Sequence, residues 1–157
     1  METGSTDILD GCAPAFPRAC WYVAAWAHDL APATTLGVQV LGEPLVLYRG
    51  ASGSVRALAD RCAHRHAPLS LGRVEGEDLR CMYHGLRYAP DGTCLEAPGA
   101  PRIPPGCRVR AYPAESRDGW IWVWMGAPEA ADPALIPAGF GLDACPGGFR
   151  SGTLDYV

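Results

Sequence analysis

Two short runs of cysteine and histidine are the residues of this sequence best suited to metal chemistry. The first run is Cys62-x-His64 and the second is Cys81-x-x-His84, with residues 65–80 between them. Thiolate and imidazole groups are ligands for zinc and for iron–sulfur clusters. Each run can direct one sulfur and one ring nitrogen toward the same side of a loop. Together the two runs offer two sulfurs and two nitrogens to a single site.

The order of these ligands distinguishes two metals. Zinc accepts a Cys₂His₂ set tetrahedrally, but zinc fingers usually place both cysteines before both histidines. Here each run carries one of each. If each loop sends its cysteine to one iron and its histidine to the other, both irons are held by both loops, as in a Rieske [2Fe–2S] centre. We favour this cluster, and hence one-electron transfer, over zinc and over four unrelated structural residues.

The elements that must position the two runs are short strands. β-formers and turn residues alternate along the chain, and no stretch longer than about ten residues has a helical period. The pattern predicts an all-β fold of small antiparallel sheets. The expected elements are strands at 21–26, 54–60 and 78–84, a pair of strands within 37–50 turning around Gly42-Glu43-Pro44, and hairpins at 86–98 and 107–126 turning at Pro90-Asp91-Gly92 and Arg117-Asp118-Gly119.

Composition excludes several classes of protein. The chain has 157 residues and a net charge of -4, without a basic stripe, so we expect no nucleic-acid partner. The N-terminal residues are acidic and polar where a signal peptide would be basic, and the apolar run "CWYVAAWA" is too short to cross a membrane. These features predict a cytoplasmic protein whose cysteines bind metal or remain free thiols.

The motif and its surroundings resemble one family. "CAHRHAPLS" and "CMYHGLRYAPDG" are similar to the Rieske domain of the ring-hydroxylating and O-demethylating non-haem iron oxygenases, especially the vanillate O-demethylase and dicamba monooxygenase type. "WYVAAWAHDL", "LGEPLVLYRG" and "GWIWVWMGAPEAADPALIP" follow the same pattern, so the resemblance covers roughly residues 20–157. It implies a [2Fe–2S] cluster in a subdomain of two ligand loops, with Cys62 and Cys81 on one iron and His64 and His84 on the other.

Two positions in the loops indicate the subclass. Rieske proteins of the cytochrome complexes carry an extra cysteine in each ligand loop, and those two cysteines form a disulfide. The corresponding positions here are Ala67 and Tyr83, which cannot form that bridge. The resemblance therefore implies the lower-potential oxygenase or ferredoxin type. Arg65 belongs to the family's Cys-x-His-Arg pattern, for which we weigh a charge pair near the cluster or a partner against a structural salt bridge.

The resemblance also implies a second iron that this chain does not hold. In this family a mononuclear Fe(II), bound by two histidines and a carboxylate, lies in a C-terminal catalytic domain. Apart from the motif, only His28 and His66 remain, and we expect both to be ordinary surface or loop residues. We expect a lead-in at 1–20, a Rieske domain at 21–126, and at 127–157 a linker rich in Ala, Pro and Gly that ends in the first strand, 149–157, of an absent catalytic domain.

The expected function follows from that division. The chain would pass electrons from a reductase or ferredoxin to a mononuclear iron in the same subunit or in a neighbouring subunit of a homotrimer. The whole assembly would be an aromatic-compound oxygenase, which is either a monooxygenase (O-demethylase) or a ring-hydroxylating dioxygenase. The alternative is a stand-alone Rieske-type ferredoxin.

Two further features have open interpretations. Trp120, Trp122 and Trp124 share one strand face, which favours core packing over a docking face, and Cys94 and Cys107 flank a Pro-rich loop, where free thiols are favoured over a disulfide.

Overall fold

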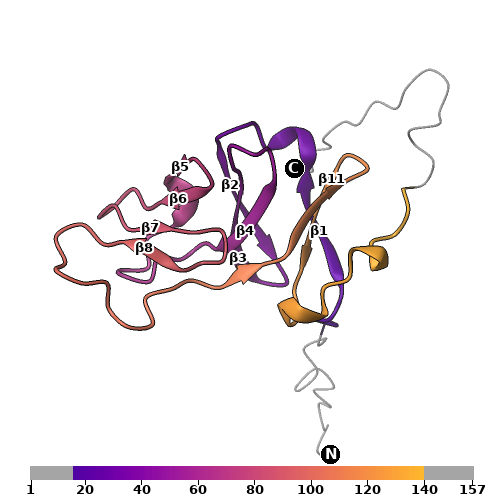
Figure 1. Ribbon diagram of the computed structural model, residues 1–157. Helices are drawn as coiled ribbons and strands as arrows, with labels where there is room; N and C mark the ends of the chain where they lie inside the picture. The colour runs from indigo at the N-terminus through magenta and orange to yellow at the C-terminus, as the bar shows by residue number, and fades with distance from the viewer. Residues whose placement is uncertain (1–15, 140–157) are drawn as a thin grey trace, which may run out of the picture.

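Short strands provide nearly all the regular structure of this computed structural model, which describes residues 16–139 (Figure 1). The strands are β1 (Trp21–Trp26), β2 (Thr35–Val40), β3 (Glu43–Arg49), β4 (Val55–Ala59), β5 (Arg73–Glu75), β6 (Asp78–Arg80), β7 (Arg87–Tyr88), β8 (Cys94–Glu96), β9 (Ala111–Tyr112), β10 (Ala114–Arg117) and β11 (Trp120–Trp124). The helical elements are single 3₁₀ turns: η1 (Ala27–Asp29), η2 (Leu69–Leu71), η3 (Pro128–Ala130) and η4 (Pro133–Leu135). The all-β prediction is confirmed. The strand expected at 149–157 lies outside the described residues.

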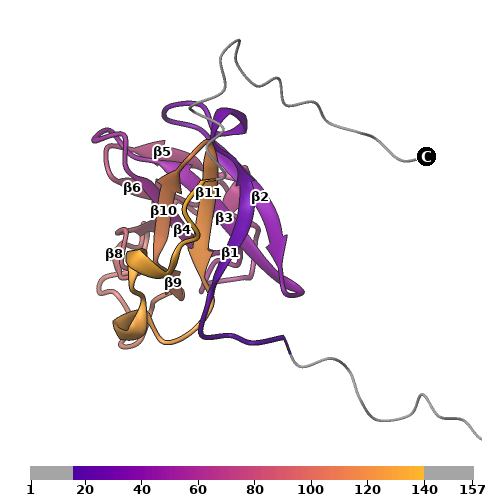
Figure 2. The ribbon, with the colours of Figure 1, turned by 90° about the vertical axis from the view of Figure 1, so that its right-hand side faces the viewer.

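The strands form three antiparallel sheets arranged along the molecule (Figures 1 and 2). Their orders are β1-β11-β10, β2-β3-β4-β9 and β5-β6-β7-β8. The middle sheet separates two apolar cores, because alternate side chains of β3 point to opposite sides. Val46 and Tyr48 pack in the core shared with β5–β8, whereas Leu45 and Leu47 pack in the core shared with β1 and β11. This burial of both faces explains the continuous apolar run of β3.

Two of the predicted hairpins turn at residues with positive φ. The β2–β3 turn is Leu41-Gly42, at φ 51° and 78°, and the β10–β11 turn is Asp118-Gly119, at φ 52° and 80°. Two consecutive residues with positive φ are the requirement of a type I′ turn, which matches the twist of the strands it joins. The β10–β11 turn is where the sequence predicted it. The prediction for β2–β3 was displaced, because Pro44 lies inside β3 opposite Gln39.

The strand expected at 78–84 is shorter than predicted. β6 ends at Arg80, because the N–H of Cys81 donates to the carbonyl of Leu86 at 2.8 Å and so closes a loop. The 86–98 hairpin is confirmed as β7 and β8, with Asp91 accepting a hydrogen bond from the N–H of Thr93 in the turn. The early end of β6 frees Cys81 and the residues after it from the sheet.

The tryptophan row of β11 is buried to different degrees. Trp124 is buried against Trp21 and Ile136, as core packing predicts, whereas Trp120 and Trp122 are half-buried. The opposite face of the strand is fully buried in the core shared with the middle sheet. Within residues 16–139 no helix is long and apolar enough to cross a membrane.

Candidate metal centre

The first ligand loop closes on itself immediately after β4. The N–H of Cys62 donates to the carbonyl of Ala67, and the N–H of His66 donates to the carbonyl of Cys62, both at 2.9 Å. The base of the loop is fixed by Asp60, whose carboxylate accepts bonds of 2.6 Å from the N–H and the hydroxyl of Ser70. This closure directs the Cys62 side chain inward and leaves that of His64 outside.

The second loop runs from Cys81 to Leu86 and resembles the first in its construction. Its end-to-end bond is the one that terminates β6, and Gly85 turns the chain at φ +76°. A side chain at Gly85 would meet Pro98 at 3.3 Å, so glycine suits both the conformation and the space. Burial raises the pKa of Cys81, and the backbone N–H groups of Tyr83 and His84 offset part of this effect by favouring the thiolate.

The loops bring the four predicted residues together as two pairs. Cys62 and Cys81 are each only 2 % exposed and belong to the same apolar core. His64 and His84 are both exposed, and their ring centroids lie 4.6 Å apart in an edge-to-face arrangement. In the described part of the chain, no three histidine, cysteine or acidic side chains are arranged to hold a single metal ion. The site thus has a sulfur pair inside and an imidazole pair outside.

Tyr88 of β7 hydrogen-bonds the inner pair. Its hydroxyl lies 3.2 Å from the Cys62 sulfur and accepts a bond of 3.1 Å from the N–H of Ala63. Because the lone pair of the hydroxyl takes the Ala63 proton, its own proton is free to donate to the sulfur. Burial, and next the neighbouring Cys62, raises the pKa of Tyr88, so it remains a protonated donor. The sequence prediction did not include this residue, because the contact joins β7 to the first loop across 26 residues of sequence.

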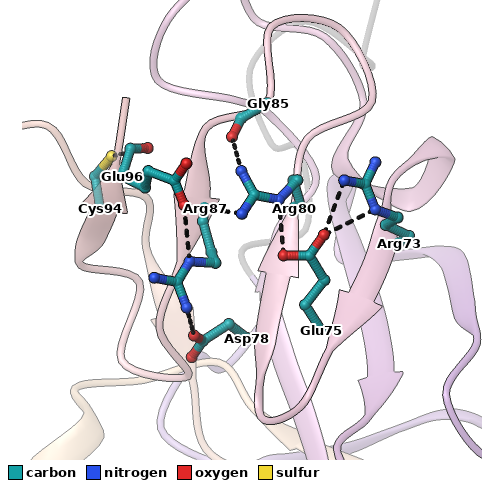
Figure 3. A network of polar contacts seen from close by, with 8 residues as sticks. All are labelled: Arg73, Glu75, Asp78, Arg80, Gly85, Arg87, Cys94 and Glu96. Carbon is teal, nitrogen blue, oxygen red and sulfur yellow. Dashed lines mark hydrogen bonds and ion pairs between the residues drawn. The ribbon is translucent and has the colours of Figure 1, made fainter. Parts of the chain in front are cut away.

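A network of ion pairs supports the second loop from the β5–β8 sheet (Figure 3). Arg80, the residue before Cys81, donates to Glu75 at 2.7 Å and to Glu96 at 2.8 Å, and also to the carbonyl of Gly85 at 2.7 Å. The last contact joins the base of the loop to the residue after His84. Arg87 extends the same network to Asp78 and Glu96. Arg80 was also missed, although its position directly before a predicted ligand cysteine was a usable signal.

A cavity of about 620 Å³ adjoins the imidazole pair. His64 and His84 line one side of it, and the segment from Ala97 to Cys107 lines much of the other. That segment includes Pro98, Pro104 and Pro105, whose fixed φ restricts its conformations. The Pro-rich stretch therefore forms a wall beside the histidines.

The remaining residues considered in the sequence lie away from the pairs or on the loop surface. His66 is exposed and turns the chain at φ +56°, and His28 is exposed beside Asp29. Arg65 is exposed, and within residues 16–139 it forms no ion pair. Cys94 and Cys107 are free cysteines, and Cys12 and Cys145 lie outside the described residues.

This combination of loops is that of a known family. Residues 20–113 match the family described as the Rieske [2Fe-2S] domain. The chain belongs to the Rieske family. Its cofactor is therefore a [2Fe–2S] cluster. The two buried thiols and two adjacent imidazoles fit this group, since they supply the donor types of a Rieske centre from two loops.

The chain has relatives in several oxygenase systems. It is 43 % identical over 141 residues to the iron–sulfur subunit of a toluene-4-sulfonate monooxygenase system from Comamonas testosteroni, covering 90 % of this chain and 41 % of that protein. It is 45 % identical over 123 residues to the oxygenase component of dicamba O-demethylase from Stenotrophomonas maltophilia, covering 78 % and 36 %. It is 46 % identical over 121 residues to the vanillate O-demethylase oxygenase subunit of Pseudomonas sp. strain HR199, covering 77 % and 34 %.

Solved structures agree with these relatives. A crystal structure of dicamba monooxygenase bound to dicamba matches with a TM-score of 0.74 at 43 % identity, covering 82 % of this chain and 38 % of that one. Another structure of the enzyme contains non-haem iron and dicamba. This confirms the resemblance to the vanillate O-demethylase and dicamba monooxygenase type and places the Rieske domain in an oxidoreductase family. The chain spans only 34 % to 41 % of the length of these relatives.

Proposed function

We propose that Cys62 and Cys81 bind one iron of the cluster and that His64 and His84 bind the other. The observation that supports this assignment is the separation of the four residues into a buried thiol pair and an exposed imidazole pair. A single zinc ion would require all four donors at tetrahedral positions around one point. Two irons instead require one pair of donors each, and the two loops together present such pairs, one of thiols and one of imidazoles.

The burial of the two pairs gives them different roles. The cluster supplies one-electron redox chemistry when bound. The core around the thiols, which includes Val46, Leu69 and Leu79, excludes water from the sulfur side of the site. The exposed rings of His64 and His84 lie nearest to solvent or to a docked protein. Electrons would therefore leave the domain at the imidazole side.

We further propose that this domain serves an aromatic-compound oxygenase in the cytoplasm. It would take electrons from a reductase or ferredoxin and deliver them to a mononuclear iron in a catalytic domain of the same or a neighbouring subunit, in a homotrimer. The support is the set of relatives, which are oxygenase components and are longer than this chain. In this scheme residues 21–126 are the electron-transfer domain, and residues 127–157 lead toward the catalytic domain.

Metal analysis and visible spectroscopy test the ligand assignment. Purified protein should contain two irons and two acid-labile sulfides per chain, with a visible absorption that bleaches on uptake of one electron. The substitutions Cys62→Ser and His64→Ala should each abolish the stable cluster. His66→Asn is the matched control, because His66 is an exposed histidine of the same loop and asparagine tolerates its positive φ. A colourless protein that contains zinc and neither iron nor sulfide would contradict the assignment.

Stopped-flow reduction tests the proposed role. A reduced plant-type or bacterial [2Fe–2S] ferredoxin should bleach the absorption of the oxidised domain within a single turnover. A domain reduced by dithionite but by no ferredoxin or flavin reductase would argue against an electron-transfer role.

A further inference from the structure

Cys94 and Cys107 face each other at the two ends of the Pro-rich wall. Thr93 and Arg108 form an antiparallel bridge, and the next residues along are Cys94 and Cys107, whose N–H and carbonyl are joined at 3.2 Å. Directly opposite residues of antiparallel strands point to the same side, with Cα atoms roughly 5.5 Å apart at a hydrogen-bonded pair. Disulfides span Cα separations of roughly 4.4–6.8 Å. The backbone register therefore suits a bond between the two sulfurs.

The two thiols differ in their access to solvent. Cys94 is buried in the core that also contains Cys62, and Cys107 packs against that core from a half-buried position. Burial, and next the adjacent Cys107 thiol, raises the pKa of Cys94 to about 11. Cys107 also lines the cavity beside His64 and His84. A small oxidant that enters the cavity would reach Cys107, whereas Cys94 is buried and does not line the cavity.

We propose that Cys94 and Cys107 are a reversible dithiol–disulfide modification site that closes the base of the 95–106 segment next to the histidine pair. This inference goes beyond the proposed function. It depends on the register of two antiparallel segments and on the cavity, and it does not require the electron-transfer role.

The oxidant is a hydroperoxide, for which hydrogen peroxide is the probe. The Cys107 sulfur attacks one peroxide oxygen, which breaks the O–O bond and gives a sulfenic acid and one water. The Cys94 sulfur then attacks the Cys107 sulfur, forms the S–S bond and releases a second water. In total the two thiols lose two protons and two electrons, and one peroxide becomes two waters. A dithiol reductant reverses the change by thiol–disulfide exchange.

The disulfide would constrain the wall of the cavity. Residues 95–106 contribute most of the surface opposite His64 and His84, and in the reduced protein their two ends are joined only through backbone pairing. A covalent bond at this point restricts the segment in the unfolded chain as well as in the folded one. The oxidised protein should unfold at a temperature roughly 5–10 °C higher than the reduced protein.

Peptide mapping of the cluster-loaded protein identifies the bond directly. Trypsin cuts after Arg87, Arg102 and Arg108, so Cys94 falls in the peptide 88–102 and Cys107 in the peptide 103–108. After peroxide treatment that preserves the visible absorption, an unreduced digest should contain these two peptides joined and two hydrogens lighter than their sum. Dithiothreitol should separate them.

The variants Cys107→Ser and Cys94→Ala are the controls. Neither should give the joined peptide, and peroxide should leave the unfolding temperature of both unchanged. Wild-type protein that keeps its absorption and yields no joined peptide would overturn the proposal. So would a joined peptide in which Cys94 or Cys107 is bonded to Cys62 or Cys81. Because the readout is a peptide mass, failure of the electron-transfer proposal would not produce either result.

Discussion

Removal of the Tyr88 hydroxyl should lower the reduction potential of the domain without unfolding it. Tyr88→Phe keeps the ring, which is fully buried, and deletes the oxygen that lies between the Cys62 sulfur and the Ala63 N–H. Reduction adds negative charge, and a donor to a ligand sulfur favours the more negative state. Without that donor the oxidised state is relatively favoured.

The contacts of the Tyr88 hydroxyl determine how much the substitution changes the free energy of unfolding and the reduction potential. The N–H of Ala63 loses its acceptor, which costs about 1–2 kcal/mol in the free energy of unfolding. Hydrogen bonds to charged groups contribute about 1.5–3 kcal/mol, and only the difference between the two redox states affects the potential. If that difference is about 1 kcal/mol, the midpoint potential falls by about 40 mV, since tenfold in a one-electron equilibrium is about 59 mV.

A redox titration followed by visible absorption measures the shift. Tyr48→Phe is the matched control, because Tyr48 is equally buried in the same core, but its hydroxyl donates to the carbonyl of Glu77 at 3.3 Å. Its potential should equal that of the wild type. An unchanged potential in Tyr88→Phe, or equal shifts in the two variants, would refute the role of the Tyr88–Cys62 contact.

Three further predictions concern the support of the loops and the fold. Arg80→Gln removes the bond to Gly85 and should speed the chelator-induced loss of the visible absorption about 10-fold. Arg87→Gln is the control, because Arg87 belongs to the same network but does not contact the loop, and its rate should stay that of the wild type. Equal rates in the two variants would contradict the role of Arg80. Gly76→Ala should lower the free energy of unfolding by about 1 kcal/mol, because Gly76 has a φ of +65° but lies in open space. Gly92→Ala should lower it by at least about 2 kcal/mol more, because the new Cβ would lie 2.0 Å from the Val109 carbonyl oxygen. Urea unfolding measures both values. The N–H of Thr93 lowers the pKa of Asp91, so the folded state gains stability above the ordinary carboxyl pKa and loses it as pH falls through the lower folded value. Between pH 5 and pH 3 the urea midpoint of Asp91→Asn should therefore fall less than that of the wild type.

Local patterns in the sequence predicted much of the fold. The strand content, the hairpins at 86–98 and 107–126, and the continuous apolar strand β3 follow from residue type and spacing alone. The displaced β2–β3 turn shows the limit of such patterns. Proline was taken as a turn residue, but the paired strands place Leu41 at positive φ instead, which residue preferences disfavour.

Contacts between distant segments could not be predicted in this way. Tyr88 reaches Cys62 only because β7 lies across from the first loop, and the pairing of β7 with β6 that places it there is a property of the folded sheet. The same holds for Cys94 and Cys107, since a sequence shows that they flank a loop but not that they lie in register.

The different exposure of the predicted cysteine and histidine ligands also depends on contacts that the sequence pattern does not show. Spacing selects a cysteine and a histidine for each loop, but the direction of each side chain depends on how the loop closes. The bonds from Cys62 to Ala67 and from Cys81 to Leu86 turn both sulfurs toward the core beneath β3. Because sulfur is readily buried and imidazole keeps its polar ring nitrogens in contact with water, the inward position suits the cysteines and the outward position suits the histidines. Exchange of the two residue types within a loop would direct a polar ring into the apolar core, so the order Cys before His suits the way both loops close.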